Sequence, residues 1–292
     1  MTDRPLVSLI VPAFRADATI SRCITSALAQ TWPHLEVVLA SDDGTDYLEL
    51  LRRSGVRDPR LRQAKTGGIG EGAVAARNAA LAIAEGSVIA QLDADDALAL
   101  DALDRLVPMA LDDGAAVSNT AVFDTEGRLY KRGVALFPLA RRFTAHDLLT
   151  PRVPFPPVFQ RRLLPEGWTA TPFAEDVLVN LQLLTVAPDM RVHPDAHYAY
   201  HKRLGSMTLG GDAADRADAG YAELLRLLAG RGLRIDPELR RAAAAQFRFD
   251  RRLNQLFRRW LRDGRCAHLE HFLDLTDAGR ASWVEAEMAA LA

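Results

Sequence analysis

The chain has 292 residues, of which 49% are hydrophobic, and its 36 Lys and Arg against 38 Asp and Glu give a formal net charge of −2. This length and hydrophobic content predict a large folded α/β domain with a smaller appendage and exclude a largely disordered chain. The near-neutral charge argues against a general nucleic-acid binder. No stretch approaches the roughly 18 uncharged apolar residues of a membrane span.

The N-terminus and the cysteines indicate a reducing compartment. Residues 2–5 lead directly into an apolar run, without the pattern of a secretory signal peptide. Cys23 and Cys266 lie far apart, so they suit neither a metal-ligand motif nor a disulfide framework. We therefore expect a cytoplasmic protein.

Short β-branched apolar runs alternate with helical stretches through the first 111 residues. The expected strands are 6–12, 35–41, 61–65 and 87–92. The expected helices are 17–30, 46–54, 71–86 and 97–111, the third of them stopped by Gly86. This alternation predicts βαβ units and a mostly parallel sheet flanked by helices.

The rest of the chain is less regular. Its expected elements are a strand and hairpin over 115–137, a proline-rich loop over 138–173, a helix over 174–184 and a strand over 196–203. From Asp212 onward the pattern is helical, with a break near 230–237. We therefore expect a catalytic domain over 1–211 and a C-terminal helical region over 212–292.

Aspartates follow the C-terminal ends of two expected strands, at positions 42, 43, 93, 95 and 96. Ligands of parallel α/β sheets bind beyond the carboxyl ends of the strands, so these side chains should share one edge. Asp95 or Asp96 alone is explained as the cap of the helix that follows. Helix capping does not explain Asp93, and hard oxygen ligands on such a turn favour Mg²⁺ or Mn²⁺.

Several motifs then occur in register: "VSLIVPAF", "SALAQTWPHLEVVLASDDGTD", "GAVAARNAAL" and "IAQLDADD". In this order and spacing they resemble the family 2 glycosyltransferases, which are inverting sugar-nucleotide enzymes with the GT-A fold. The resemblance covers residues 1–110 closely and continues thinly to about 208. It implies a GT-A Rossmann-like sheet.

The resemblance also implies a nucleotide-sugar donor, expected to be a UDP-sugar, and a glycan or lipid-linked hydroxyl acceptor. The Asp-x-Asp motif of the family corresponds to Asp93-Ala94-Asp95. It implies that Asp93 and Asp95 hold a divalent cation, Mn²⁺ or Mg²⁺, and that Asp93 and Ala94 contact the nucleotide sugar. Asp96 then supports this turn or caps the next helix.

The edge after the first strand is expected to hold the nucleotide base. By resemblance, Pro12, Ala13 and Phe14 line it, and Asp43 accepts from the N–H groups of the base. Asp17 matches a frequent acidic position. Each has another explanation: core packing for Phe14, a helix N-cap for Asp17, and an Asx turn into the next glycine for Asp43.

Arg77, on the 71–86 helix, is expected to contact base or phosphate. The sequence departs from the family pattern at Arg15 and Gly70, where asparagine is usual, and in the short "DDGTD" segment, which puts a role for Asp46 in doubt. Trp168 is expected either to form a wall for the acceptor or to pack in the core.

The segment "TPFAEDVLVNLQLL" resembles the Glu-Asp motif of the family, which implies that Asp176 is the catalytic base with Glu175 beside it. Acids in the first turn of a helix are common without any such role. Arg203 and Ser206, in the segment that resembles the closing loop of the family, are expected to reach the diphosphate. His201 is a candidate metal ligand or a structural histidine.

The expected helix over 248–265 has arginines around an apolar stripe made of Leu253, Leu256, Phe257, Trp260 and Leu261. This pattern fits a peripheral membrane contact, a helix packed on its neighbours or a homodimer contact.

Together the motifs favour a metal-dependent inverting glycosyltransferase of surface polysaccharide synthesis. Two alternatives are a catalytically inactive nucleotide-sugar-binding module, which the departures from the family pattern favour, and a nucleotidyltransferase on a similar fold. A nucleotidyltransferase is expected to carry a basic glycine-rich N-terminal loop, which this sequence lacks.

Overall fold

The computed structural model of the chain describes residues 4–134, 139–151, 153–171, 173–202, 213–276 and 283–289. It divides into two compact units. The first unit is Met1–Ala170 with Ala174–His201, and the second is Thr171–Phe173 with Lys202–Ala292. The expected boundary near 211 lies outside the described residues and stays a prediction.

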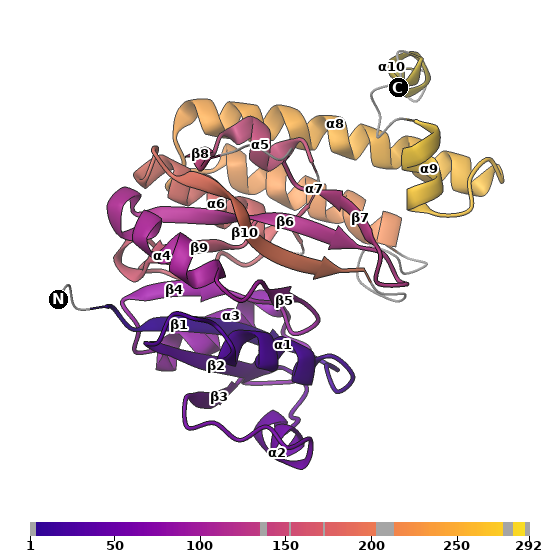
Figure 1. Ribbon diagram of the computed structural model, residues 1–292. Coiled ribbons are helices and arrows are strands. Elements are labelled where there is room, and N and C mark those ends of the chain that lie inside the picture. The colour runs from indigo at the N-terminus through magenta and orange to yellow at the C-terminus, as the bar shows by residue number, and fades with distance from the viewer. Residues whose placement is uncertain are drawn as a thin grey trace. The chain divides into compact units, whose positions relative to one another are not determined.

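A single mixed sheet forms the centre of the first unit (Figure 1). Its ten described strands follow the order β3-β2-β1-β4-β9-β6-β10-β5, with β7 paired to β6 and β8 paired to β10. The first four strands along the chain are β1 (Val7–Ala13), β2 (Leu35–Ser41), β3 (Leu61–Lys65) and β4 (Val88–Gln91). They pair in parallel, as do β6 (Ala115–Phe123) and β10 (Arg191–His201). The predicted α/β class with a mostly parallel sheet is confirmed.

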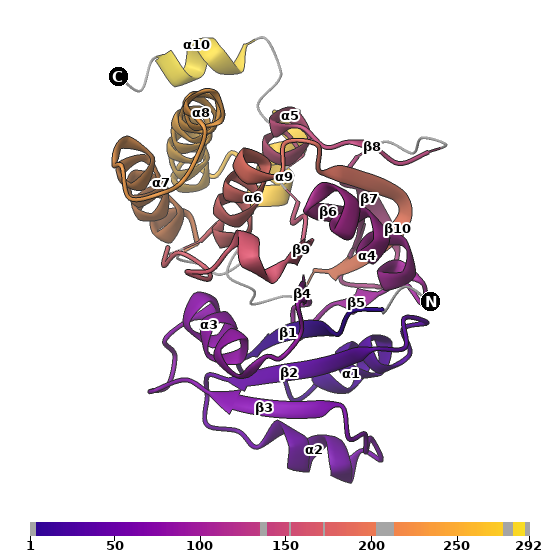
Figure 2. The same ribbon diagram turned by 90° about the vertical axis from the view of Figure 1, so that its left-hand side faces the viewer.

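Helices cover both faces of the N-terminal strands, because βαβ connections are right-handed and the chain reverses direction after β3. Figures 1 and 2 show α1 on one side of β1 and β2 and α3 on the other. The helices are α1 (Ile20–Leu28), α2 (Tyr47–Arg53), α3 (Ala73–Ile83) and α4 (Ala102–Asp113). Asp46 caps α2 by accepting from the amide of Glu49 at 2.9 Å, which gives this aspartate a structural role.

The apolar runs of the strands and helices meet in one core. Val7, Leu9 and Val11 of β1 are fully buried together with Ile20 and Ile24 of α1. The inward face of each of these elements was readable from its periodicity, because strands buried on both faces are continuously apolar and flanking helices are amphipathic. This packing fixes the strand ends from which the acidic turns emerge.

Three expected elements differ in the structure. The helix expected over 97–111 begins only at Ala102, because Ala97–Leu98 form the short strand β5, which pairs with β10. The helix α3 ends at Ile83, three residues before Gly86, since Ala84 is already extended. The strand β10 starts at Arg191, five residues earlier than expected.

The region expected to be a loop over 138–173 contains regular structure. It holds β8 (Arg141–Arg142), α5 (Ala145–Leu149), β9 (Pro157–Gln160) and the short 3₁₀ helix η1 (Arg161–Leu163). The strand β9 lies antiparallel between β4 and β6, so it joins the two parallel parts of the sheet. The remaining elements of this unit are β7 (Leu129–Arg132) and α6 (Glu175–Val186).

The regular elements of the second unit are helices in its described residues. Its elements are α7 (Ala213–Ala229), α8 (Pro237–Arg262), α9 (Leu269–Leu275) and α10 (Val284–Ala289). Asp236 caps α8 by accepting from two amides, and Pro237 occupies the first helical position, where its missing N–H is not needed.

The apolar stripe of α8 packs inside its own unit. Leu253, Leu256, Phe257 and Trp260 are buried and form a cluster with residues of α9 and α10, whereas Leu261 is 38% exposed. Several of the surrounding arginines pair with acids of the same unit, for example Arg251 with Asp218, Arg258 with Asp215 and Arg265 with Glu287. The interpretation as a packed helix therefore fits, while a peripheral membrane contact and a homodimer contact of this helix stay predictions.

Among the described residues, no helix combines the length and the apolar character that crossing a bilayer requires.

Gly86 lies where β1 and the start of β4 come very close. A Cβ atom on Gly86 would lie 2.5 Å from Oγ of Ser8 and 2.6 Å from its main-chain nitrogen. We expect Gly86→Ala to lower the free energy of unfolding by about 1–3 kcal/mol, because the backbone has to shift. Chemical denaturation measures this. Gly232→Ala, where no atom lies within 4 Å of the added Cβ, is the control and should be as stable as the natural chain or slightly more so.

Candidate functional site

The acidic turns lie at the same edge of the sheet, beyond the C-terminal ends of β1, β2 and β4. Main-chain bonds hold these ends in register: the amide of Asp42 donates to Ala13 at 2.9 Å, and the amide of Leu92 donates to Ile10 at 3.1 Å. The expectation that aspartates after different strands share one edge follows from the parallel pairing of these strands.

Arg77 is the centre of this edge. It lies in the second turn of α3 and is 3% exposed. Its Nη2 donates to Oδ1 of Asp93 at 2.7 Å, and its Nη1 donates to Oε1 of Glu175 at 2.7 Å. The side chains expected to bind the donor and the pair expected to serve the acceptor are therefore joined by one guanidinium.

This arrangement shifts the pKa values of three neighbouring acids in different directions. Burial pushes the pKa of Glu175 upward, but the charge and hydrogen bond of Arg77 bring it below its usual value. The pKa of Asp93 is raised by burial, which Arg77 only partly offsets. Burial and the adjacent charge of Glu175 raise the pKa of Asp176 to about 7, while Arg77 opposes the shift. A carboxyl that titrates near neutral pH is suited to general base catalysis.

Asp96 supports the acidic turn from beneath and does not cap the next helix, which begins at Ala102. It is fully buried, and burial raises its pKa well above the usual value. Its two oxygens accept from the hydroxyl of Tyr198 at 2.7 Å and from the amide of His201 at 2.8 Å. The hydroxyl of Tyr198 also accepts from the amide of Asp93 at 3.1 Å, so β10 fixes the shape of the turn.

Asp95 lies in the same turn, half-buried, and its carbonyl accepts from the guanidinium of Arg22 on α1. The ring of His201 stacks on Phe123 with 5.1 Å between centroids, and its Nδ1 lies 3.0 Å from the carbonyl of Ala199. These contacts are those of a structural histidine, and a role of His201 in metal binding stays a prediction.

The edge after β1 carries an exposed aromatic ring. Phe14 is 43% exposed, so it does not pack in the core, and the guanidinium of Arg15 lies 5.0 Å from its ring centre. Pro12 is half-buried and Ala13 is buried at the end of β1. Asp17 is exposed and does not cap α1, whose N-cap residue is Thr19.

Asp43 is held by its own surroundings. Its carboxylate accepts from the amides of Arg15 (2.6 Å) and Thr45 (2.9 Å) and from the hydroxyls of Tyr47 (2.7 Å) and Ser41 (3.1 Å). Burial opposes ionisation, but these donors keep its pKa well below the usual range. A carboxylate has about four acceptor positions, so contact with a nucleotide base would require one donor to give way.

Asp42 organises the glycine-rich segment before α3. Its carboxylate accepts from the hydroxyl of Thr66 and from the amides of Glu71 and Gly72, at 2.9 to 3.0 Å. The carboxylate thus binds the amides that lead into α3, which sets the position of the helix that carries Arg77.

Two residues of the site have a backbone conformation that side chains rarely adopt. Among the described residues, Arg15 (φ 49°) and Ala174 (φ 57°) are the non-glycine residues with positive φ. Ala174 directly precedes Glu175 and Asp176 at the start of α6. Such a conformation costs of order 1–3 kcal/mol and tends to occur at functional sites.

Other predicted residues lie elsewhere. Trp168 is 3% exposed and its indole N–H donates to Gln91 at 3.3 Å, so it packs in the core and does not form an acceptor wall. Ala94 is buried, which leaves only its main chain for contacts. Arg203 and Ser206 lie outside the described residues.

Sequence reasoning did not assign roles to Tyr47 and Tyr198. Both are fully buried aromatic residues whose hydroxyls bind aspartates of the site. The sequence offered one weak signal, since a buried tyrosine needs a partner for its hydroxyl. It did not indicate which aspartate that partner would be.

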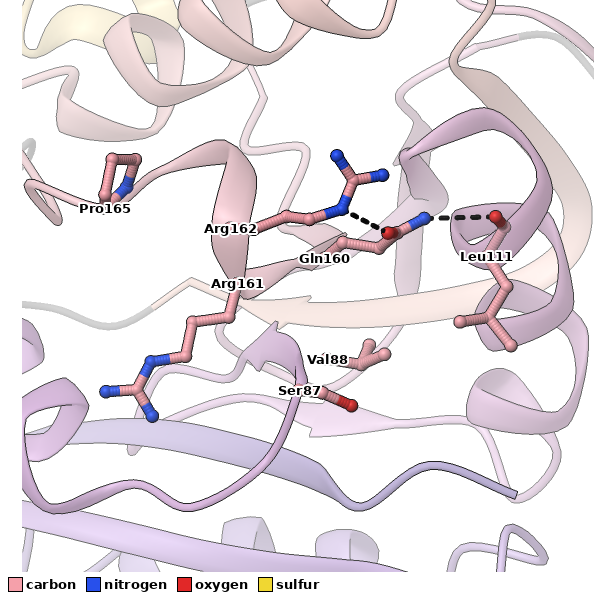
Figure 3. A pocket seen from close by; sticks show the side chains of 7 residues that line it. All are labelled: Ser87, Val88, Leu111, Gln160, Arg161, Arg162 and Pro165. Carbon is pink, nitrogen blue, oxygen red and sulfur yellow. Dashed lines mark hydrogen bonds between the residues drawn. The ribbon is translucent and has the colours of Figure 1, made fainter. Parts of the chain in front are cut away.

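A cavity of about 540 Å³ lies at the opposite end of β4 (Figure 3). It is lined by Ser87, Val88, Leu111, Gln160, Arg161, Arg162 and Pro165. In the wall of this cavity, the side-chain amide of Gln160 donates to the carbonyls of Ala110 and Leu111. Arg161 donates to carbonyls at the end of α3. None of the predicted site residues lines this cavity, so we locate the candidate site at the acidic edge.

The comparison with protein families agrees with the motifs. The model of the family "Glycosyl transferase family 2" matches residues 8–166, which is more than half of the chain. The chain belongs to glycosyl transferase family 2. The matched region includes the ends of β1, β2 and β4 and Arg77, but not Glu175 and Asp176.

One similar curated protein is the succinoglycan biosynthesis protein ExoO of Rhizobium meliloti. It is 33% identical over 221 residues, which cover 70% of this chain and 63% of ExoO. The chain therefore spans less than two thirds of the length of this relative.

Two solved structures share the fold. S. aureus TarS 1–349 in complex with UDP-GlcNAc has a TM-score of 0.62 at 20% identity, over 83% of this chain and 71% of that one. The mannosyltransferase PcManGT from Pyrobaculum calidifontis, in complex with GDP-Man and Mn²⁺, has a TM-score of 0.63 at 18% identity. The match covers 99% of this chain and 80% of that one. At this identity the two structures show a shared GT-A fold.

Removal of the Arg77 charge should destabilise the protein. Arg77→Met leaves Glu175 and the partly exposed Asp93 without their cation, so we expect the free energy of unfolding to fall by about 2–4 kcal/mol in chemical denaturation. The double variant Arg77→Met/Glu175→Gln should recover part of this loss, because it removes one of the unpaired carboxylates. A loss below about 1 kcal/mol for Arg77→Met would show that solvent already screens both acids.

Proposed function

We propose that the chain is a metal-dependent inverting glycosyltransferase that transfers a sugar from a nucleotide-diphosphate sugar, a UDP-sugar, to a hydroxyl of a glycan or lipid-linked acceptor. One observation carries this proposal: Arg77 joins the Asp93-Ala94-Asp95 turn to the helix start that bears Asp176, a carboxyl whose pKa is raised to about 7 by burial and by the charge of Glu175. Three comparisons support it: membership of glycosyl transferase family 2, similarity to a protein named for succinoglycan biosynthesis (ExoO), and the shared fold of TarS, which was solved with UDP-GlcNAc.

The carboxylate oxygens of Asp93 and Asp95 suit a hard divalent cation. The described residues contain no cluster of three or more His, Cys, Asp or Glu side chains arranged for a metal. Mg²⁺ and related cations are commonly held by one or two carboxylates together with substrate phosphates, so Asp93 and Asp95 are a sufficient protein contribution. When bound, the cation supplies stabilisation of the negative charge that develops on the leaving diphosphate.

The base in this proposal is Asp176. Its ionised carboxylate takes the proton of the acceptor hydroxyl while the hydroxyl oxygen forms a bond to the anomeric carbon. The bond between that carbon and the diphosphate oxygen breaks, and its electron pair stays on the diphosphate. Attack from the side opposite the leaving group inverts the configuration of the sugar.

The nucleotide base is expected next to Phe14. Its exposed ring offers a stacking surface, and Arg15 stands beside it in place of the usual asparagine. Asp43 holds the backbone of this segment through the amide of Arg15, so it shapes the base site even where it makes no contact with the base itself. Asp17, Pro12 and Ala13 remain predicted donor contacts.

Incubation with Mn²⁺ and a panel of sugar nucleotides tests the proposal. Slow release of nucleoside diphosphate from one donor, accelerated by an acceptor glycan, is the expected result. Formation of pyrophosphate would indicate a nucleotidyltransferase, and binding without turnover would indicate an inactive nucleotide-sugar-binding module.

Asp95→Asn should abolish Mn²⁺-dependent binding of UDP and leave the fold intact, because the change removes a charge at the sheet edge and no core volume. Isothermal titration calorimetry with and without Mn²⁺ measures the binding. If the Asp95→Asn variant binds UDP as well as the natural chain in the presence of Mn²⁺, the assignment of Asp95 as a metal ligand is wrong.

Asp176→Asn should lower kcat by about 10²–10⁴-fold, the usual contribution of a positioned base, with little change in donor affinity. The substitution is nearly isosteric, so the melting temperature should hold. Glu175→Gln is the control and should affect turnover less. Near-normal transfer by Asp176→Asn together with a large loss in Glu175→Gln would reverse the two roles.

The pH dependence of kcat follows from the pKa of Asp176. The base has to be ionised, so kcat should rise with pH and reach half of its plateau near pH 7. The charged groups that act on this pKa are Glu175, Arg77 and Asp93. Since the charge of Glu175 raises the pKa of Asp176, Glu175→Gln should move the midpoint to lower pH. A midpoint that stays in place or rises would contradict this account of the site.

A further inference from the structure

The two carboxylates bound by Arg77 come from distant parts of the chain. Asp93 follows β4 and is 16 residues from Arg77, whereas Glu175 begins α6 and is 98 residues from it. The Arg77 side chain is 4% exposed, and the side chains of Glu175 and Asp93 are 14% and 33% exposed. All of these elements belong to the first unit.

The guanidinium has one positive charge to share between two negative ones. Each terminal nitrogen serves one acid, and the buried Nε has no hydrogen-bond partner among the described residues. In a poorly solvated site, charge interactions are several times stronger than in water, so neither acid can gain or lose charge without affecting the other.

We infer that Arg77 is a positioning residue that couples the two sides of the site, so that Glu175 on the acceptor side sets how strongly Arg77 holds Asp93 on the donor side. The inference rests on the proposed function, which assigns Asp93 to the donor complex and Glu175 to the acceptor side. Coupling of this kind is reciprocal. If the charge of Glu175 changes the affinity for the donor, then binding of the donor changes the stability of the charged form of Glu175 by the same free energy.

The direction of the coupling follows from the charges. While Glu175 is ionised, its negative charge offsets the positive charge of Arg77, so a cation can approach Asp93. Without the charge of Glu175, the positive charge of Arg77 is no longer offset, and it repels the cation and competes with it for the carboxylate of Asp93. A change on the acceptor side should therefore weaken donor binding that depends on the cation.

Arginine suits this task better than lysine. The planar guanidinium presents several N–H donors in a fixed fork, which lets one side chain bind two carboxylates in different directions. An ammonium group is a compact charge at the end of a flexible chain. In Arg77→Lys it should pair with one acid at a time, which keeps the positive charge but breaks the bridge.

The test is a double-mutant cycle on the affinity for UDP in the presence of Mn²⁺, measured by calorimetry and independent of turnover. In the natural background, Glu175→Gln should weaken binding by about tenfold. In the Arg77→Lys background, the same change should weaken it by less than about twofold. Non-additivity between residues in contact is what such cycles detect.

Arg161→Lys is the matched control. Arg161 donates to carbonyls at the C-terminal end of the same helix α3 and touches neither acid. Its replacement should leave the affinity for UDP unchanged and report what an exchange of arginine for lysine does to stability alone.

Three results would overturn the inference. Glu175→Gln without effect on UDP affinity would show that no coupling exists, and an equal effect in both backgrounds would show that it does not pass through Arg77. No binding of UDP by the natural chain would overturn the proposed donor site and this inference with it.

Where Arg77→Lys does not fold, the charge-balanced Arg77→Gln/Glu175→Gln replaces it. Its affinity should lie within about twofold of the natural chain, and a loss as large as that of Glu175→Gln would count against the coupling.

Discussion

The guanidinium of Arg77, buried between two carboxylates, is the interaction on which the geometry of the site depends. An unpaired charge in such a place costs several kcal/mol, so α3, the turn after β4 and the start of α6 have to keep positions in which both ion pairs form. Asp42 fixes the entry into α3, and Asp96 with Tyr198 fixes the turn. The acids that surround Arg77 are therefore spaced by the fold and not by their own mutual repulsion.

Much of the first unit follows from the sequence, because its strands are continuously apolar and its helices have one apolar face. Periodicity identifies such elements, and parallel pairing then places Asp43, Asp93 and Asp95 at one edge. The strand β9 escaped prediction since it is four residues long, starts with Pro157 and gains its strand character by pairing with β4 and β6. Local sequence does not encode such a partner.

The sequence suggests individual residues of the candidate site but not the contacts between them. The acids at 93, 95, 175 and 176 stand out because carboxylates cluster after a buried strand and at a helix start. That Arg77 binds two of them, or that Asp43 is already occupied by four donors, depends on side chains brought together from separate elements. The second unit shows the limit of a sequence pattern alone. The arginine-rich pattern of α8 fits a membrane contact, a packed helix or a dimer contact, and the packing of its apolar stripe against α9 and α10 is visible only in the structure.

The support of the acidic turn by β10 has a consequence for the order of folding. Tyr198 binds the amide of Asp93 across 105 residues of chain, and β9 also has to insert beside β4 before the sheet is continuous. Pairings between distant segments form slowly, whereas the βαβ units of the first hundred residues need only nearby partners. We expect a ribosome-bound nascent chain to acquire its N-terminal strands early while the edge of β4 stays open. During this interval an unpaired strand edge is exposed, which is the kind of surface that aggregates or recruits chaperones.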